Sequence, residues 1–89
     1  MQQYYNKDNI SLNYLCCYVI IIRESDGVKL INTILNTSLK FFNSTDIVEN
    51  LISDLRRGIS YNSLIERLDN FSDSAYELYE YMLQIGLLE

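Results

Sequence analysis

The chain carries few side chains that could perform acid–base or nucleophilic chemistry. Among its 89 residues there is no His, and the only two cysteines are the neighbours Cys16 and Cys17. Without an imidazole there is no ordinary catalytic triad, no histidine metal site and no side chain whose unperturbed pKa lies near neutrality. The other candidates are scattered carboxylates such as Asp69 and Asp73, and none of them is placed with a base. We therefore expect no enzymatic activity, no metal and no cofactor.

The two cysteines lie within an apolar run at 12–22. Side chains of successive strand residues point to opposite faces of a sheet, so a Cys16–Cys17 bridge or a shared metal is geometrically unfavourable. We interpret both as reduced, core-type thiols of a cytoplasmic protein. The run is shorter than the ~20 residues that a membrane helix needs. Arg23-Glu24-Ser25-Asp26 follows it in place of a small-residue cleavage site, so we expect neither a membrane span nor a signal peptide.

The elements that must position any binding residues begin with an antiparallel sheet. Aromatic, β-branched and other apolar residues at 15–22 favour a strand, and the Asp-Gly step at 26–27 favours a tight reversal into a second strand at 28–35. The Asn-Thr step at 36–37 indicates the next reversal. A short third strand is expected at 39–42.

The second half of the chain changes to helical periodicity. A first helix is expected behind the capping candidates at 43–45, and it ends with two arginines and Gly58. Ser60 can cap a second, shorter helix. A capping box at 74–77 begins a third helix that ends at Gly86. The predicted fold is α+β, with a three-stranded antiparallel sheet followed by three helices.

Length and charge limit the domain count and the partners. Eighty-nine residues suffice for a single core, and the expected division is a polar N-terminal tail at 1–12 and one domain at 13–89. Seven Lys and Arg against twelve Asp and Glu give a net charge of −5, and the segment 72–89 has no Lys or Arg. This is the wrong sign for a chain that neutralises phosphates, so we expect no nucleic-acid partner.

The third helix has more apolar positions than one core-facing stripe needs. Leu78, Met82 and Ile85 form one stripe, and Tyr76, Tyr79 and Leu83 form another. Two interpretations remain open. Either both stripes belong to a small core, or the second stripe lines a groove in which tyrosines offer an apolar body and a polar tip.

Short motifs in the chain resemble those of PqqD-like proteins, the peptide-recognition elements of pathways that modify ribosomally made peptides. In that family the third strand ends in a hydrophobic-Leu-Asn step, a Gly follows the first helix, and the last helix ends in Gly and aliphatic residues. The matching positions are Phe42-Asn43, Gly58 with Ile59-Ser60 after it, and Gly86-Leu87-Leu88. Phe42 replaces the usual Leu. The order of elements resembles the family over residues 15–89.

The resemblance implies a winged-helix-like fold without catalytic activity. It implies that the leader segment of a precursor peptide adds as a strand along the third strand, lies against the third helix, and is presented to a separate peptide-modifying enzyme. Strand addition is physically reasonable, because an edge strand offers unpaired N–H and C=O groups to any extended partner.

The candidate peptide-binding residues come from two elements. The edge is assigned to Leu39, Lys40, Phe41 and Phe42, and the wall on the third helix to Tyr76, Tyr79, Glu80 and Leu83, with Lys40 and Glu80 as polar contacts. Whether Leu39 and Phe41 or Lys40 and Phe42 face the groove depends on the register of the strand.

Two other functions are weighed against peptide capture. A winged-helix outline is also typical of DNA-binding regulators, but the acidic second half disfavours that reading. A generic protein-interaction subunit with the same fold is the stronger alternative. Alternation along the first strand places apolar side chains on both faces of the sheet: Cys17, Val19 and Ile21 on one, and Cys16, Tyr18, Ile20 and Ile22 on the other. Because helices can cover only one face, we expect the sheet to contact an enzyme, another subunit or a second copy of the chain.

Overall fold

The computed structural model describes residues 11–42 and 45–89. A three-stranded antiparallel sheet and three helices are present, which confirms the α+β class, and a second sheet of two short strands accompanies them. The elements are β1 (Leu12–Asn13), β2 (Val19–Glu24), β3 (Gly27–Asn32), β4 (Thr37–Phe42), α1 (Thr45–Arg57), β5 (Ile59–Ser60), α2 (Tyr61–Leu68) and α3 (Ala75–Gln84).

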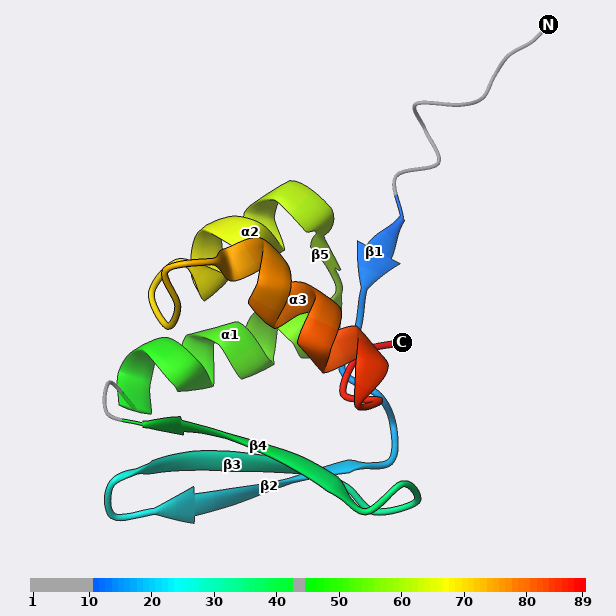
Figure 1. The fold of residues 1–89 in the computed structure, drawn as a ribbon, viewed down its shortest axis with the longest axis vertical. Coiled ribbons are helices and arrows are strands. Elements are labelled where there is room, and N and C mark those ends of the chain that lie inside the picture. The colour runs from blue at the N-terminus through cyan, green and yellow to red at the C-terminus, as the bar shows by residue number, and fades with distance from the viewer. Residues whose placement is uncertain (1–10, 43–44) are drawn as a thin grey trace, which may run out of the picture.

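The molecule has two layers. Figure 1 shows the three helices on one side of the sheet formed by β2, β3 and β4, with β1 and β5 beside the helices. The strand order is β2-β3-β4, so β3 is central and β2 and β4 are the two edges. The inner face of the sheet packs on the helices through residues such as Val28, Leu30 and Phe41, which are buried. On the outer face Ile20 and Ile22 are exposed.

The first long strand begins later than expected. The sequence pattern predicted it at 15–22, whereas β2 covers Val19–Glu24. The preceding segment is held elsewhere: Tyr14 exchanges backbone hydrogen bonds with Glu89, and the Cys16 N–H donates to the carbonyl oxygen of Leu87 at 2.9 Å. These bonds fix the segment beside the end of the chain and remove it from the ladder with β3.

This placement corrects the interpretation of the cysteines. Neither Cys16 nor Cys17 belongs to a strand, both thiols are free, and Cys17 is exposed and so is not a core residue. The division of the first strand into two faces therefore holds only from Val19 onward.

The reversal between β3 and β4 also comes earlier than expected, because of one buried side chain. The predicted second strand ran to residue 35, but β3 ends at Asn32. The Asn32 side-chain oxygen accepts hydrogen bonds from the backbone N–H groups of Ile34 and Leu35, both at 2.9 Å. Its amide nitrogen donates to the carbonyl oxygen of Gly86 at 2.7 Å. Asn32 thus bends the chain into the turn and ties that turn to the end of α3.

The helix boundaries agree with the capping residues. Ser60 and Ser74 accept hydrogen bonds from the N–H groups of Ser63 and Glu77 and so cap α2 and α3. Gly58 follows α1 with φ +98°, a conformation that favours glycine. The capping candidates Asn43 and Ser44 lie outside the described residues.

One hydrophobic core joins the sheet to all three helices. Its largest fully buried side chains are Leu30, Leu51, Leu55, Leu64, Leu68, Met82, Leu87, Val28 and Val48.

Most of the expected 1–12 tail lies outside the described residues, but Leu12 is part of β1 and pairs with Ser60 of β5. Within the described ranges we find no helix with the length and apolar character that crossing a membrane requires.

Candidate functional site

A groove runs between β4 and the helical layer, with a volume of about 520 Å³. Its floor is aromatic: the rings of Phe41 and Phe71 lie 4.7 Å apart between centroids and are tilted by 55°. Strand β4, the connection from α2 to α3, and the first half of α3 supply the lining residues, which are Leu39, Lys40, Phe41, Phe42, Asn70, Phe71, Ser72 and Leu78.

The edge of β4 next to this groove has backbone groups that no described strand pairs with. The carbonyl oxygen of Tyr18 accepts a hydrogen bond from the N–H of Thr33 at 3.0 Å, which fixes the phase of the bonding between β2 and β3. Bonded and non-bonded pairs alternate in an antiparallel ladder, so alternate residues of β3 bond to β2 and the others to β4. In the observed register, the residues of β3 that do not bond to β2 bond to Thr37, Leu39 and Phe41 of β4. The N–H and C=O groups of Ser38, Lys40 and Phe42 therefore point outward. No described strand pairs with that edge.

The register answers the question that the sequence left open. Leu39 and Phe41 lie opposite the buried residues Leu30 and Val28 of β3, so their side chains face the helices and the groove. Lys40 therefore belongs with Phe42 on the outer face.

Lys40 is held on the outer face by two carboxylates. Its ammonium lies 2.6 Å from Asp26 and 2.8 Å from Glu24, and 4.9 Å from the centroid of the Phe42 ring. The hydrogen bond to Asp26, and then that to Glu24, raises the pKa of Lys40, and the same contact with Lys40 lowers the pKa of Asp26. Lys40 thus reaches the groove through its backbone and stem, while its charge is directed to the turn between β2 and β3.

The predicted residues of α3 lie elsewhere. The Tyr79 ring packs edge-on against Tyr61 with centroids 5.0 Å apart, and its hydroxyl donates to the side-chain oxygen of Asn13 at 3.2 Å. Burial, with a smaller effect of nearby Glu80, raises the pKa of Tyr79. Tyr79 therefore faces α2 and β1.

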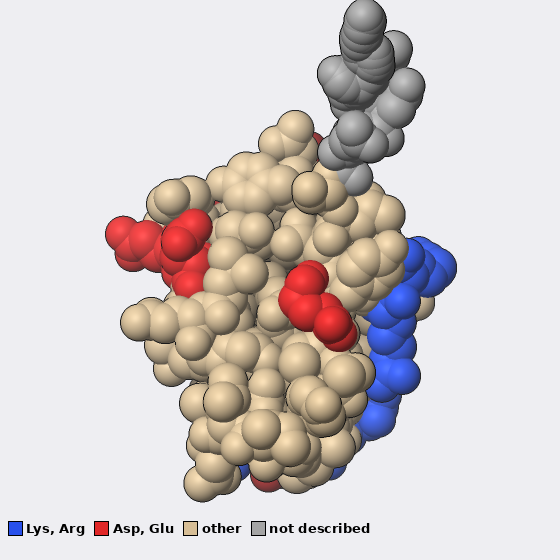
Figure 2. All heavy atoms as spheres, turned by 90° about the vertical axis from the view of Figure 1, so that its right-hand side faces the viewer, with Lys and Arg blue, Asp and Glu red and all other residues tan. Residues whose placement is uncertain are grey.

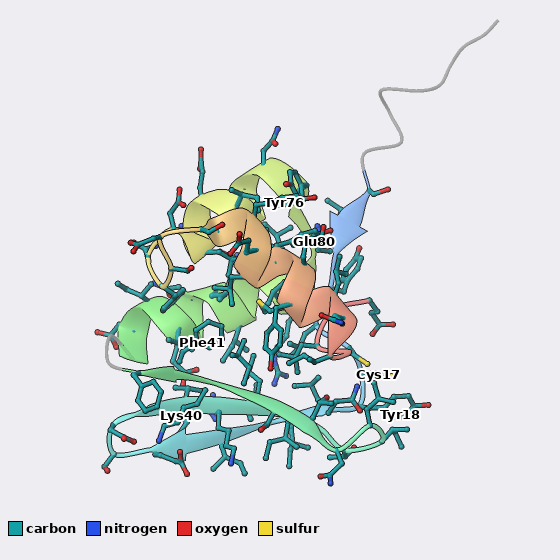
Figure 3. The ribbon with its side chains drawn as sticks, viewed as in Figure 1. Cys17, Tyr18, Lys40, Phe41, Tyr76 and Glu80 are labelled. Carbon is teal, nitrogen blue, oxygen red and sulfur yellow. The ribbon has the colours of Figure 1, made fainter. Side chains whose placement is uncertain are left out.

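The other three residues of the predicted wall also lie outside the groove. Figure 3 shows Tyr76 and Glu80 on the side of α3 that points away from the sheet, whereas Phe41 and Lys40 lie on β4. Leu83 is exposed and follows Tyr79 by one helical turn. The structure thus brings together the four predicted edge residues and separates them from the four predicted wall residues.

The wall is formed instead by Leu78, which the sequence pattern assigned to the core-facing stripe, and by Phe71, which it did not name as a binding residue. Helical spacing puts Tyr81, which is 46% exposed, on the same side of α3 as Leu78 and Ile85. The Thr37 hydroxyl donates to the Ile85 carbonyl oxygen, so this side of α3 adjoins β4. The excess of apolar residues in α3 indicated that one side of this helix could line a groove. It did not indicate whether the stripe of Leu78 or that of Tyr79 faces the edge strand.

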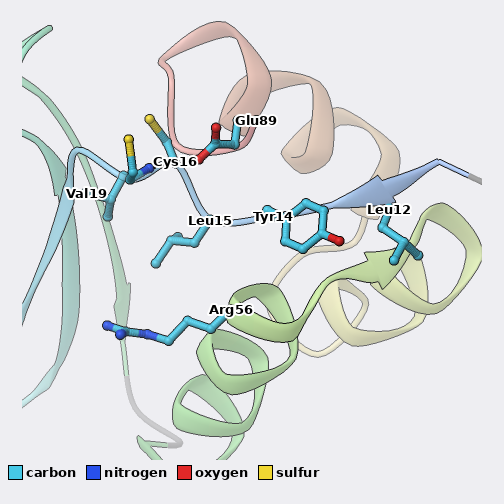
Figure 4. A pocket seen from close by; sticks show the side chains of 8 residues that line it. Leu12, Tyr14, Leu15, Cys16, Val19, Arg56 and Glu89 are labelled. Carbon is cyan, nitrogen blue, oxygen red and sulfur yellow. Dashed lines mark hydrogen bonds between the residues drawn. The ribbon is translucent and has the colours of Figure 1, made fainter.

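A second hollow, of about 590 Å³, lies between the segment before β2 and the end of α1 (Figure 4). The backbone N–H of Cys17 donates to the Glu89 carboxylate at 2.9 Å. The lining residues are Leu12, Tyr14, Leu15, Cys16, Cys17, Val19, Arg56 and Glu89. Within the described residues no three side chains of the metal-binding types gather, at this hollow or at the groove.

Comparisons with known proteins give no relative for this chain: no family model matches it, and neither a curated protein nor a solved structure is significantly similar. The resemblance to PqqD-like proteins therefore depends on the short motifs alone.

Proposed function

We propose that the protein captures a peptide without modifying it. In this proposal an extended leader segment of a ribosomally made precursor adds to β4 as a further strand and is presented to a separate modifying enzyme. The observation that carries the proposal is the juxtaposition of a strand edge that no described strand pairs with and a groove of mixed polar and apolar lining, with Phe41, Phe71 and Leu78 among its residues, at the same strand. The winged-helix-like description of the fold belongs to the same proposal and is supported by the order of strands before helices.

The two features have separate roles in binding. Backbone groups of Ser38, Lys40 and Phe42 hydrogen-bond to any extended chain, whereas the groove selects among sequences. Successive side chains of a strand point to opposite faces, so alternate residues of the peptide enter the space between Leu39 and Leu78. We therefore expect a ligand with two apolar residues separated by one position. We expect the peptide to bind with micromolar or better affinity, which corresponds to a binding free energy of about −8 kcal/mol.

Charge supports a peptide ligand over a nucleic acid. The side of the molecule that carries β1 and the end of the chain, drawn in Figure 2, is largely uncharged, with its Lys and Arg side chains at the right-hand and lower margins and acidic side chains elsewhere. The net charge of the chain is −5. Several described arginines are engaged with acids: Arg23 with Glu49, and both Arg57 and Arg67 with Asp54. A phosphate backbone would need unpaired cations gathered on one surface.

The test is a titration of the ¹⁵N-labelled protein with fluorescently labelled leader segments of short reading frames that neighbour its gene. Binding should shift the backbone amide signals of Ser38, Lys40 and Phe42 in NMR spectra and give saturable fluorescence anisotropy. The variant Ser38→Pro should abolish binding, because it removes an outward N–H without breaking a bond to β3.

The control is Ile21→Pro, which removes an outward N–H from the opposite edge of the same sheet and should leave peptide affinity unchanged. Both variants must show the wild-type circular dichroism spectrum. Equal peptide binding by Ser38→Pro and wild type would overturn strand addition at β4. Shifts confined to β4 with an unrelated apolar peptide, and none with a leader, would favour the generic interaction subunit.

A further inference from the structure

Strand β2 is an edge strand without the usual protection against pairing. Its first four residues, Val19-Ile20-Ile21-Ile22, combine strong β propensity with no charge, Pro or Gly. Edge strands are commonly protected by Lys, Pro, a bulge or a covering element. The pairing of β2 with β3 is continuous from Val19 to Glu24, without a bulge, and no described strand covers its other edge.

The backbone groups at this edge follow from the same alternation that applies to β4. Since the Tyr18 carbonyl bonds to β3, Ile20, Ile22 and Glu24 also bond to β3, and Ile21 and Arg23 direct their N–H and C=O groups outward. The Val19 N–H is already donated to the Cys16 carbonyl oxygen at 3.0 Å. The free groups are therefore centred on Ile21.

We propose that two copies of the chain pair through β2, antiparallel and across a two-fold axis at Ile21, to form one continuous sheet from the three strands of each copy. In this register Ile21 lies opposite the Ile21 of the second copy, and their outward N–H and C=O groups bond to each other. Ile20 lies opposite Ile22 of the second copy on the outer face. Val19 lies opposite Arg23: its carbonyl accepts the Arg23 N–H of the second copy, while its own N–H stays bonded to Cys16.

The neighbouring registers are less favourable. An axis at Ile20 brings Val19 opposite Ile21, so each Ile21 carbonyl faces a Val19 N–H that is already bonded within the chain, whereas the axis at Ile21 lets the two Ile21 residues exchange both bonds. An axis at Ile22 sets Ile20 opposite the charged side chain of Glu24. Moving the axis by one residue slides the pairing by two residues and keeps every side chain on its own face, so the backbone groups and the facing side chains decide between these registers. The strand is thus complementary to itself in one arrangement, which is the reason for choosing a second copy as the partner.

Charges at the contact do not oppose the pairing. The Arg23 guanidinium is hydrogen-bonded to Glu49 of α1, with Nη2 and Oε1 2.8 Å apart, and the Glu24 carboxylate is 2.8 Å from the Lys40 ammonium. Each copy nevertheless carries a net charge of −5. Repulsion between two such copies is long-range and is screened by salt, so the dimer should be tighter at high ionic strength.

Pairing would also join apolar side chains of the outer face into one strip. Ile20 and Ile22 are 48% and 39% exposed in the single chain, and cross-strand pairs of β-branched residues stabilise a sheet. The β4 edges would lie at the two ends of the combined sheet, about 24 Å apart at the usual strand spacing. The dimer and the proposed peptide site therefore use different edges and are independent.

Sedimentation equilibrium of the full chain, from micromolar to submillimolar concentration at low and high salt, tests the proposal. Wild type should show a monomer–dimer equilibrium that shifts toward dimer as salt is added. Ile21→Pro should be monomeric throughout, whereas Ser38→Pro on the other edge should dimerise as wild type does. A monomeric wild type, or dimerisation that survives in Ile21→Pro and is lost in Ser38→Pro, would overturn the proposal.

A second pair of variants covers the case in which Ile21→Pro does not fold. Ile20 and Ile22 are exposed, so replacing both by Lys, or both by Glu, leaves the core intact. Each double variant alone should be monomeric, since like charges face each other, and an equimolar mixture should form a heterodimer. Heterodimer formation by this mixture is expected where β2 of one copy pairs with β2 of the other, and its absence, with both variants folded, would contradict pairing through β2.

Discussion

Asn32 shows how one buried polar residue defines a turn. Its side chain makes four hydrogen bonds, including a long one from its amide nitrogen to the Cys16 sulfur at 3.8 Å, and the residue is 3% exposed. Asn32→Ala should lower the free energy of unfolding by about 1–3 kcal/mol, because the two turn N–H groups and the Gly86 carbonyl lose their partner in a partly buried place. Urea denaturation measures this loss.

The control for this prediction is Asn62→Ala, at an exposed position of α2. It should change stability by less than about 0.5 kcal/mol, as most surface substitutions do. If both variants lose the same small amount, the hydrogen bonds of Asn32 do not hold the turn.

At the scale of elements, α3 determines which residues contact a ligand on β4. Leu78 lines the groove, whereas Leu83 is exposed on another side of the same helix. On the proposed function, Leu78→Ala should weaken peptide binding about tenfold, or roughly 1.4 kcal/mol, because it removes an apolar contact beside β4. Leu83→Ala makes the same chemical change and should leave the affinity unchanged. Fluorescence anisotropy compares the two variants, and an affinity loss in Leu83→Ala alone would move the site to the tyrosine side of α3.

The elements differ in how well the sequence predicted them. Helix ends are set by neighbouring residues, so Ser60, Ser74 and Gly58 marked them correctly. Strand ends depended on distant partners. The segment before Val19 leaves the sheet to bond with the end of the chain, and β3 stops where Asn32 bonds to Gly86.

The candidate site follows the same distinction between local and distant information. Its edge at 39–42 was predictable, because the last strand of a three-stranded meander lies at an edge of its sheet. The wall was not. Helical periodicity separates the stripe of Leu78 from that of Tyr79, but the rotation of α3 about its axis is fixed by contacts with Thr37, Tyr61 and Asn13, which are far away in the sequence.

For the whole molecule, an ion pair between the layers links stability to pH. Arg23 of β2 holds Glu49 of α1, and the hydrogen bond from Arg23 lowers the pKa of Glu49. The unfolded chain therefore protonates Glu49 near the ordinary value of about 4.3, at a higher pH than the folded chain does. The stabilisation is complete above that value and is lost as the pH falls toward the folded pKa. The urea midpoints of wild type and Glu49→Gln should thus differ at neutral pH and converge in acid. The control is Glu66→Gln, at an exposed glutamate with no ion pair among the described residues, and its urea midpoint should follow that of wild type at every pH. A gap between wild type and Glu49→Gln that stays constant into acid would mean that the link between sheet and helix does not depend on the Glu49 charge.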